Sequence, residues 1–207
     1  MPDSPPERIG VFGGTFDPPH VGHLVTAVNV RHALELDQLL LVVANVPWQK
    51  EGTREITPAE HRYALVEAAV QGVDGIEASR IELDRGGESY TADTLAALQD
   101  TNPDVTLFVV LGSDAAAGLD TWERYEEVRD RSTIVVVDRP GATPTQPPDG
   151  FRWMNVEVPR LEVSSTDLRA RVVDGRPLDY LLPRPVIAGI RARGLYQDDV
   201  YDRDRTA

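Results

Sequence analysis

Cysteine is absent from this chain of 207 residues. Without thiols the protein has no disulfide, no thiolate zinc site, no iron–sulfur cluster and no cysteine nucleophile. Any chemistry must therefore use oxygen and nitrogen groups. The hydrophobic fraction of 41% is enough for one α/β core. We expect a single domain over residues 1–207, with its core at 8–196.

Positive charge is scarce. The net charge is −13 at pH 7, and the chain contains one lysine, Lys50, beside its arginines. Such a field repels polyanions, so the composition argues against general nucleic-acid binding and against binding to anionic membranes. A small phosphate ligand remains compatible with this charge where backbone amides and a few cations converge.

Long apolar runs are also missing. The longest, Leu39 to Ala44, is far shorter than the ~20 residues that span a bilayer. The opening MPDSPPERIG lacks the positively charged and apolar regions of a signal peptide. We therefore expect a cytoplasmic protein. A homo-oligomer is compatible with the sequence, which does not determine the oligomeric state.

Strand and helix patterns alternate along the chain, which predicts an α/β fold. We expect a Rossmann-like, doubly wound and mostly parallel sheet with helices on both faces and a small C-terminal helical part. A mobile loop is predicted over 141–151 and a frayed tail over 197–207. Strands are predicted over 8–12, 39–46, 76–83, 105–111, 133–137 and 153–158, and helices over 20–34, 61–70, 90–99 and 164–173, with a helical pair over 178–193.

The segment GGTFDPPHVGH, residues 13–23, follows the first predicted strand. Its two leading glycines let the backbone approach a phosphate closely, and the next helix directs free N–H groups and its positive dipole end toward the same place. His20 and His23 are three residues apart, so both imidazoles face one way, and Gly22 keeps the surface between them bare. Two isolated histidines at a helix start would more often be capping or solvated. Their place at the carboxyl end of a strand favours a phosphate site.

A second segment, VSSTDLR at residues 163–169, predicts a hydroxyl-rich helix start followed by an arginine. Serine and threonine at a helix start are ordinary caps, and on its own that interpretation is preferred. Combined with the first segment, it predicts two helix N-termini that grip a triphosphate from both ends. The G-x-G-x-x-G spacing of dinucleotide sites is absent, so hydride transfer is disfavoured.

These two segments also carry a resemblance. GGTFDPPHVGH followed by VSSTDLR resembles the nucleotidyltransferase superfamily with the H-x-G-H signature. Within it, the chain from 8 to 196 resembles the bacterial nicotinate-mononucleotide adenylyltransferases. Supporting matches are VPWQK (46–50), SYTADTL (89–95), LGSD with Trp122 after Asp114, VDRPG (137–141) and RARGLY (191–196).

The resemblance implies an enzyme of NAD biosynthesis that transfers AMP from ATP to nicotinate mononucleotide, giving deamido-NAD and pyrophosphate. Such a transfer needs positioning and positive charge rather than a covalent nucleophile, which suits a chain without cysteine. Mg²⁺ would bind mainly through the ATP phosphates, with no metal site of the protein's own. The implied residues are His20, His23 and Arg169 for catalysis, Gly13, Gly14, Thr15, Phe16, Ser164, Ser165 and Thr166 for ATP, and Lys50, Thr91, Asp114 and Trp122 for nicotinate mononucleotide.

Two other function classes stay open at this stage. Other small-molecule nucleotidyltransferases of the superfamily use the same phosphate machinery with nicotinamide mononucleotide or phosphopantetheine as the acceptor. Pantetheine-phosphate adenylyltransferases are usually shorter and lack the Trp122 and VDRPG pattern. The other class is a catalytically silent nucleotide-binding protein on this fold, and the intact His20, His23 and Arg169 argue against it.

Overall fold

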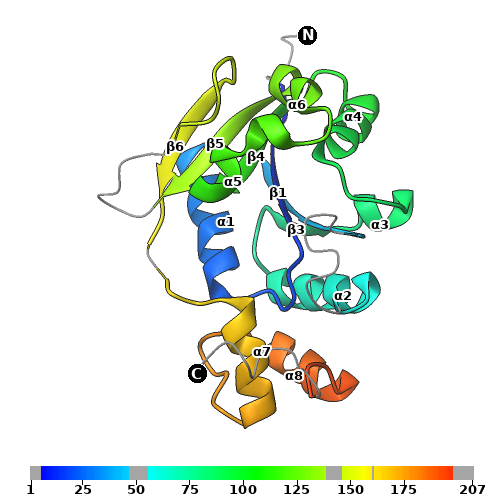
Figure 1. Cartoon of the computed structure of the whole chain (residues 1–207), viewed down its shortest axis with the longest axis vertical. Helices are drawn as coiled ribbons and strands as arrows, with labels where there is room; N and C mark the ends of the chain where they lie inside the picture. Colours follow the sequence, from blue (N-terminus) through cyan, green and yellow to red (C-terminus); the bar gives the residue numbers. More distant parts are fainter. Residues whose placement is uncertain (1–5, 47–55, 139–145, 160, 198–207) are drawn as a thin grey trace.

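A six-stranded parallel sheet forms the centre of the protein (Figure 1). The computed structural model describes residues 6–46, 56–138, 146–159 and 161–197. Its strand order, β3-β2-β1-β4-β5-β6, is that of a doubly wound sheet, so the predicted α/β fold class is confirmed. The strands are β1 (Arg8–Gly14), β2 (Gln38–Val43), β3 (Ile76–Ser79), β4 (Thr106–Gly112), β5 (Ser132–Asp138) and β6 (Trp153–Glu157).

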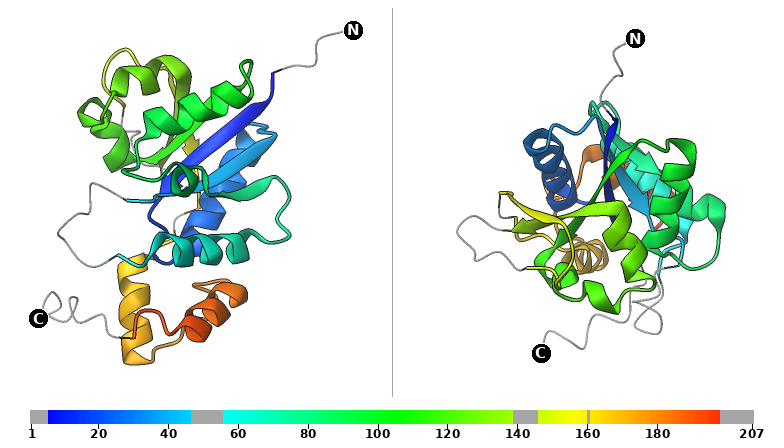
Figure 2. Two further views of the ribbon diagram at one scale, coloured as in Figure 1. Left: turned by 90° about the vertical axis from the view of Figure 1, so that its right-hand side faces the viewer. Right: turned by 90° about the horizontal axis from the view of Figure 1, so that it is seen from above.

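Helices lie on both faces of this sheet (Figure 2). One face is covered by α1 and α2, and the other by α4, α5 and α6 with the 3₁₀ turn η2. The helical elements are α1 (Val21–Ala33), α2 (Ala59–Val70), α3 (Ile81–Arg85), α4 (Thr91–Thr101), α5 (Ser113–Ala117), η2 (Leu119–Thr121), α6 (Tyr125–Arg131), α7 (Ser165–Asp174) and α8 (Arg184–Arg193).

The continuous apolar runs form strands because both of their faces are buried. In β4, Leu107 and Val109 pack in the cluster that includes residues of α4 and α6. Phe108 and Val110 point to the opposite face, where they pack in the cluster with residues of α1 and α2. Successive side chains of a strand point to opposite faces, so a strand covered on both sides has no polar side.

The predicted C-terminal helical part lies beyond one end of the sheet, where α7 and α8 pack together (Figure 1). Its apolar cluster includes Leu168 of α7 and Ile190 of α8. Leu65 and Ala69 of α2 belong to the same cluster, so α2 is packed on the sheet by one side and on the C-terminal helices by the other.

The strand predicted over 76–83 is wrong in its second half. β3 ends at Ser79, where its pairing with β2 stops opposite Val42, and the next residues form α3. Ile81 and Leu83 alternate with polar residues as in a strand, but a strand also needs a hydrogen-bonded neighbour.

The helical pair predicted over 178–193 is a single helix, α8. Within 178–182 the structure has an isolated bridge between Asp179 and Leu182, and Tyr180 has a left-handed backbone with φ of 64°. Pro183 follows, and a residue that precedes proline avoids the helical conformation.

Several other predictions concern segments that the structure describes only in part. Of the loop predicted over 141–151, residues 141–145 lie outside the described residues, and 146–151 contain neither helix nor strand. The predicted tail, 197–207, lies outside them after its first residue. Among the described helices, none is long and apolar enough to cross a membrane.

Arg62 of α2 links three backbone segments through its guanidinium group and is 1% exposed. Its Nη1 donates to the carbonyl oxygen of Thr15 at 2.9 Å, and its Nε donates to that of Thr57 at 2.7 Å. Its Nη2 donates to the carbonyl oxygen of Asn45 at 3.1 Å. One planar fork therefore joins the loop after β1, the loop after β2 and the start of α2.

We predict that Arg62→Met lowers the free energy of unfolding by about 3 kcal/mol or more, because three carbonyl groups lose their donor. Urea unfolding measures the change. Arg80→Met is the control, since Arg80 forms ion pairs with exposed Glu60 and Asp84 and exposed pairs contribute at most ~1 kcal/mol. Equal losses in the two variants would contradict the linking role.

Candidate active site

The loop of residues 15–20, here called the first loop, connects β1 to α1 and is held by side chains of α7. The Arg169 Nη1 donates to the carbonyl oxygen of Asp17 at 2.9 Å, and the Ser165 hydroxyl donates to that of Pro18 at 2.9 Å. These partners are about 150 residues apart in sequence. The N-termini of α1 and α7 therefore lie against the same loop.

The side chain of Asp17 fixes the first loop from within. It is 2% exposed, and its carboxylate accepts hydrogen bonds from the Tyr196 hydroxyl at 2.8 Å and from the backbone N–H of Thr57 at 3.4 Å. Burial and the neighbouring carboxylate both raise the pKa of Tyr196, so the phenol stays a proton donor. The last described segment of the chain thus closes over the loop.

The two predicted histidines form a stacked pair at the start of α1. Their ring centroids are 3.7 Å apart, and the backbone N–H of His20 donates to Nδ1 of His23 at 3.2 Å. Since Nδ1 of His23 is an acceptor, a neutral His23 carries its proton on Nε2. Gly22 suits this packing, because a Cβ there would make a tight contact of 3.0 Å with the His20 ring. The ring of His23 also meets Phe16 edge-on at 5.0 Å between centroids.

His20 is the more buried histidine of the pair, at 7% exposed. Within the described part of the chain, its Nδ1 is buried and has no hydrogen-bond partner. Burial lowers the pKa of His20 to about 4, so its imidazole is neutral at pH 7. Any contact that His20 makes with a phosphate is therefore a neutral hydrogen bond.

The two glycines at the end of β1, Gly13 and Gly14, have different surroundings. A Cβ at Gly13 would meet nothing within 4 Å, so this position leaves open space. A Cβ at Gly14 would lie 2.8 Å from the ring of Phe16. Phe16 itself is 3% exposed in the apolar core and has a left-handed backbone with φ of 49°. An ATP contact by Phe16 would therefore use its backbone rather than its buried ring.

The second predicted segment begins α7 as expected. The Ser164 hydroxyl accepts from the backbone N–H of Asp167 at 3.2 Å, which is an ordinary helix cap. Arg169 is 4% exposed, and its Nη2 donates to the Thr166 hydroxyl at 3.3 Å. The described contacts of this segment hold the first loop in place, and its contact with phosphates stays a prediction.

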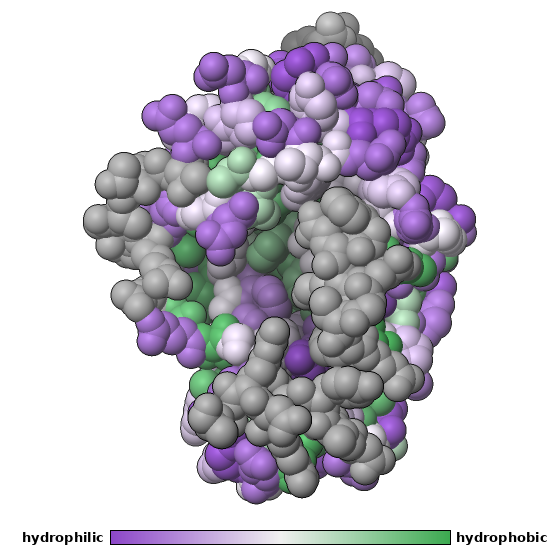
Figure 3. All heavy atoms as spheres, in the orientation of Figure 1, coloured by the Kyte–Doolittle hydropathy of each residue, from purple (hydrophilic) through white to green (hydrophobic). Residues whose placement is uncertain are grey.

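A cavity of about 210 Å³ opens at the carboxyl ends of β1, β2 and β4. Figure 3 shows a hollow with apolar side chains in the middle of the face that Figure 1 presents. The strand order reverses beside β1, and ligands of doubly wound sheets bind at such a switch point. The cavity is lined by Val11, Gly13, Gly14, Thr15, Val42, Ala44, Glu82, Ser89, Tyr90, Thr91, Thr94, Val109, Leu111, Ala115, Trp122 and Glu123.

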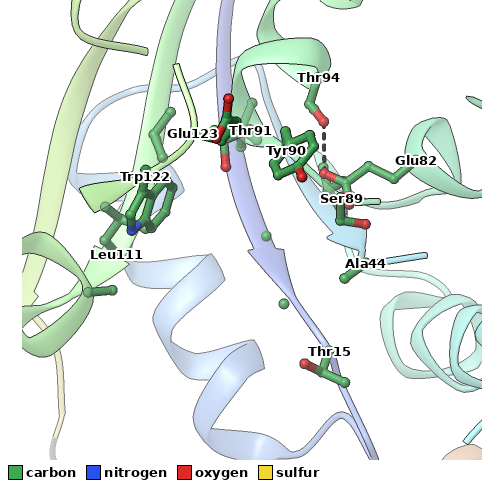
Figure 4. A pocket seen from close by; sticks show the side chains of 16 residues that line it. Thr15, Ala44, Glu82, Ser89, Tyr90, Thr91, Thr94, Leu111, Trp122 and Glu123 are labelled. Carbon is green, nitrogen blue, oxygen red and sulfur yellow. Dashed lines mark hydrogen bonds between the residues drawn. The ribbon is translucent and has the colours of Figure 1, made fainter. Parts of the chain in front are cut away.

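The predicted acceptor residues divide into three groups. Thr91, the first residue of α4, and Trp122 line the cavity, where Figure 4 shows them with their side chains. Asp114 lies in the first turn of α5, exposed and outside the lining. Lys50 lies outside the described residues. The structure thus brings Thr91 and Trp122 together with Gly13, Gly14 and Thr15 around one space.

Sequence reasoning missed Arg62, Glu82 and the role of Asp17. The sequence predicts a strand over 76–83, which includes Glu82. Arg62 lies in a predicted helix among ordinary charged residues, and nothing in that pattern marks it as buried. The hydrogen-bond partners of Glu82 and Asp17 did carry a signal: these partners, Thr94 and Tyr196, lie in the SYTADTL and RARGLY motifs.

Metal-binding side chains do not gather at this site. Among the described residues, no group of three or more histidine, aspartate or glutamate side chains lies close enough to hold a metal ion. Asp17, the carboxylate nearest in sequence to the histidines, is bound by Tyr196 and Thr57. These residues suit a cation that is carried by a phosphate ligand better than one held by the protein.

Comparisons with known proteins agree with this arrangement. Residues 11–171 match the model of the cytidylyltransferase-like family. A probable nicotinate-nucleotide adenylyltransferase of Streptomyces coelicolor is 44% identical over 191 residues, which cover 91% of this chain and 100% of that protein. One from Mycolicibacterium vanbaalenii is 40% identical over 201 residues, with 93% of each chain covered.

Solved structures show the same fold at lower sequence identity. The nicotinic acid mononucleotide adenylyltransferase of Plasmodium falciparum, solved in complex with NaAD, superposes with a TM-score of 0.76 at 17% identity. The match covers 94% of this chain and 99% of that one. A putative nicotinate-nucleotide adenylyltransferase from Vibrio parahaemolyticus gives a TM-score of 0.66 at 20% identity, covering 93% and 96%.

We predict that His20 makes folding stability depend on acidity. Its pKa of about 4 in the folded protein lies below the value of about 6.5 for an unfolded histidine, so the unfolded chain binds more protons between these values. The neutral, buried His20 therefore contributes about 3 kcal/mol to the free energy of unfolding at neutral pH. This contribution is fully present above pH 6.5 and is lost as the pH falls toward 4.

Urea unfolding of wild type and His20→Asn at pH 7.5 and pH 4.5 measures this contribution. The wild type should lose more stability than the variant between the two pH values, and the exposed His32→Asn should follow the wild type. If His20→Asn loses as much stability as the wild type, the buried neutral imidazole is refuted.

Proposed function

Because the chain belongs to the cytidylyltransferase-like family and, within it, to the nicotinate-nucleotide adenylyltransferases, we propose that it transfers AMP from ATP to nicotinate mononucleotide. The products are deamido-NAD and pyrophosphate, in NAD biosynthesis. The observation that carries the proposal is one cavity that joins Trp122 and Thr91 to Gly13, Gly14 and Thr15 of the histidine-bearing segment. An acceptor and a triphosphate can meet there.

The reaction forms one phosphorus–oxygen bond and breaks another. An oxygen of the acceptor's 5′-phosphate attacks the α-phosphorus of ATP, and the bond to the β-phosphate oxygen breaks as pyrophosphate leaves. Negative charge builds on the α-phosphoryl oxygens in between, so fixed hydrogen-bond donors there lower the barrier. His23 is suited to this role because its Nδ1 is occupied by the His20 backbone N–H, which leaves Nε2–H as the donor.

The β- and γ-phosphates of ATP, which leave as pyrophosphate, bind at the N-terminus of α7 in this proposal. The first turn of this helix carries Ser165 and Thr166, and Arg169 follows one turn later. The helix N-terminus supplies partial positive charge. Arg169 supports the first loop through its bond to the Asp17 carbonyl oxygen, and its guanidinium adds a fixed positive charge at the end of α7 where we expect the β- and γ-phosphates.

Mg²⁺ is the expected companion of ATP. When bound to the phosphates it supplies positive charge and keeps most of its waters, so it needs few protein ligands. The described residues suit this arrangement, since none of their acidic or histidine side chains form a group of three that could hold a metal.

The acceptor's pyridine ring lies against Trp122, and its carboxylate meets backbone N–H groups at the start of α4. The first N–H groups of a helix lack partners within the helix, and Thr91 is the first residue of α4. Glu123 lines the same cavity but is exposed, so its own carboxylate reaches solvent. ATP and nicotinate mononucleotide are the proposed partners, and a cytoplasmic location remains a prediction.

A pyrophosphate-release assay tests the proposal directly. Purified protein is supplied with ATP, Mg²⁺ and, in separate reactions, nicotinate mononucleotide, nicotinamide mononucleotide, phosphopantetheine or glycerol phosphate. We expect release with nicotinate mononucleotide, and deamido-NAD as the second product by chromatography. Release only with phosphopantetheine or glycerol phosphate would assign a different transferase, and no release with any acceptor would favour a silent nucleotide-binding protein.

We predict that His23→Ala, and to a lesser degree His20→Ala, lowers kcat far more than it weakens ATP binding. A loss of about 10²-fold in kcat is the scale for removing a preorganised donor to a developing negative charge. Steady-state kinetics and ATP titration measure the two effects. The exposed His32→Ala should behave as wild type, and near-normal turnover in His23→Ala would return this histidine to a capping role.

We predict a preference for nicotinate over nicotinamide mononucleotide. Backbone N–H groups placed for an anion would face the NH₂ of a carboxamide, and such an unpaired buried group costs ~1–3 kcal/mol, or roughly ten- to a hundredfold in kcat/KM. Steady-state kinetics with both mononucleotides measure the ratio. An equal or reversed preference would overturn the nicotinate assignment and leave adenylyl transfer standing.

A further inference from the structure

A buried carboxylate, Glu82 of α3, forms part of the cavity wall. Its residue is 6% exposed, and its Oε1 accepts a hydrogen bond from the Thr94 hydroxyl at 2.8 Å. Thr94 belongs to α4 and is 1% exposed. This bond uses one of the two carboxylate oxygens, and Figure 4 shows it beside the cavity. Glu82 therefore brings a carboxylate group to the wall of the proposed acceptor site.

Glu82 has no cationic partner within the described part of the chain. None of the ion pairs there includes it, and the Thr94 hydroxyl is its hydrogen-bond partner. The neighbouring walls are largely apolar, with Val11, Val42 and Val109 among them. A charge in apolar surroundings acts more strongly on a second charge than a charge in water does. An anionic group placed beside Glu82 therefore meets repulsion from its carboxylate.

The cavity has two chemically different sides. Figure 4 shows Glu82, Thr94 and Ser89 on one side, and Trp122 with Leu111 on the other. A pyridine mononucleotide whose ring lies against Trp122 can place the substituent of the ring in two directions, related by a half-turn about the bond to the ribose. For a carboxylate substituent, the direction toward Glu82 brings two negative charges together, whereas Thr91 offers backbone donors.

We propose that Glu82 is a specificity-determining residue, which disfavours an anionic ring substituent and keeps it away from the α3 side of the cavity. This inference rests on the proposed acceptor site. Two opposing effects then act on the carboxylate of nicotinate mononucleotide: the N–H groups at Thr91 favour its binding, and the charge of Glu82 disfavours it. The preference between nicotinate and nicotinamide mononucleotide is the balance of these two effects. A carboxamide is neutral and has an N–H donor, so it is not repelled by the carboxylate of Glu82.

The variant Glu82→Gln tests the inference, because its amide oxygen can still accept from Thr94 while the charge is removed. Isothermal titration gives the Kd of the wild type and the variant for nicotinate mononucleotide and for nicotinamide mononucleotide. We expect the ratio of the two Kd values to shift by about tenfold in favour of nicotinate mononucleotide in the variant. The shared 5′-phosphate cancels in this ratio, so the ratio reports the ring substituent alone.

Two further variants separate charge from structure. Glu123→Gln makes the same exchange at the same cavity, but at an exposed residue, and should move the ratio by less than about twofold. Thr94→Val keeps the charge of Glu82 and removes its hydrogen bond, so it should weaken both mononucleotides alike. An unchanged ratio in Glu82→Gln, or an equal shift in Glu123→Gln or Thr94→Val, would overturn the inference.

The binding measurement also keeps this inference apart from the proposed function. If the wild type binds the mononucleotides but forms no deamido-NAD with ATP, the proposed function fails and the Kd ratio still decides the role of Glu82. If the wild type forms deamido-NAD and the ratio is unchanged in Glu82→Gln, the inference fails and the proposed function stands.

Discussion

The first loop depends on the satisfaction of its backbone carbonyl groups by distant side chains. The carbonyl oxygens of Thr15, Asp17 and Pro18 accept from Arg62, Arg169 and Ser165 respectively. A loop that leaves a parallel sheet has no neighbouring strand to pair with, and a buried carbonyl without a donor is costly. These three bonds join the first loop to α2 and α7, whose contacting residues lie 47 to 152 residues away in sequence.

This constraint accounts for the use of arginine at two buried positions. Arg62 and Arg169 are 1% and 4% exposed, and each contacts more than one oxygen from a single planar group. A lysine ammonium is more strongly hydrated and presents its donors from one atom, so it cannot bridge separated carbonyls in the same way. In a chain with a single lysine, arginines supply the buried cationic hydrogen-bond donors as well as the positive charge of the surface.

The histidine pair shows how local packing decides chemistry. The His20 ring stacks on His23 in space that Gly22 leaves open, and the burial of this ring keeps it neutral at pH 7. The same turn fixes the tautomer of His23 through the backbone N–H of His20. In the proposed reaction, this gives a protein with a net charge of −13 oriented hydrogen-bond donors for a developing negative charge. In the proposed acceptor site, the carboxylate of Glu82 would have the opposite effect on an anion.

The sequence by itself determined the parallel α/β sheet, the strand–loop–helix at 13–23 and the helix start at Ser164, because each depends on local periodicity and capping chemistry. It misplaced 80–83 and 178–182, where local patterns imitate a strand or a helix but neighbouring elements decide the outcome. Only the tertiary structure decided that Arg62, Glu82 and Asp17 are buried. Apart from Thr57, which lies five residues from Arg62, the partners named above lie 12 to 179 residues away in sequence, and burial arises from packing between elements, which no local pattern encodes.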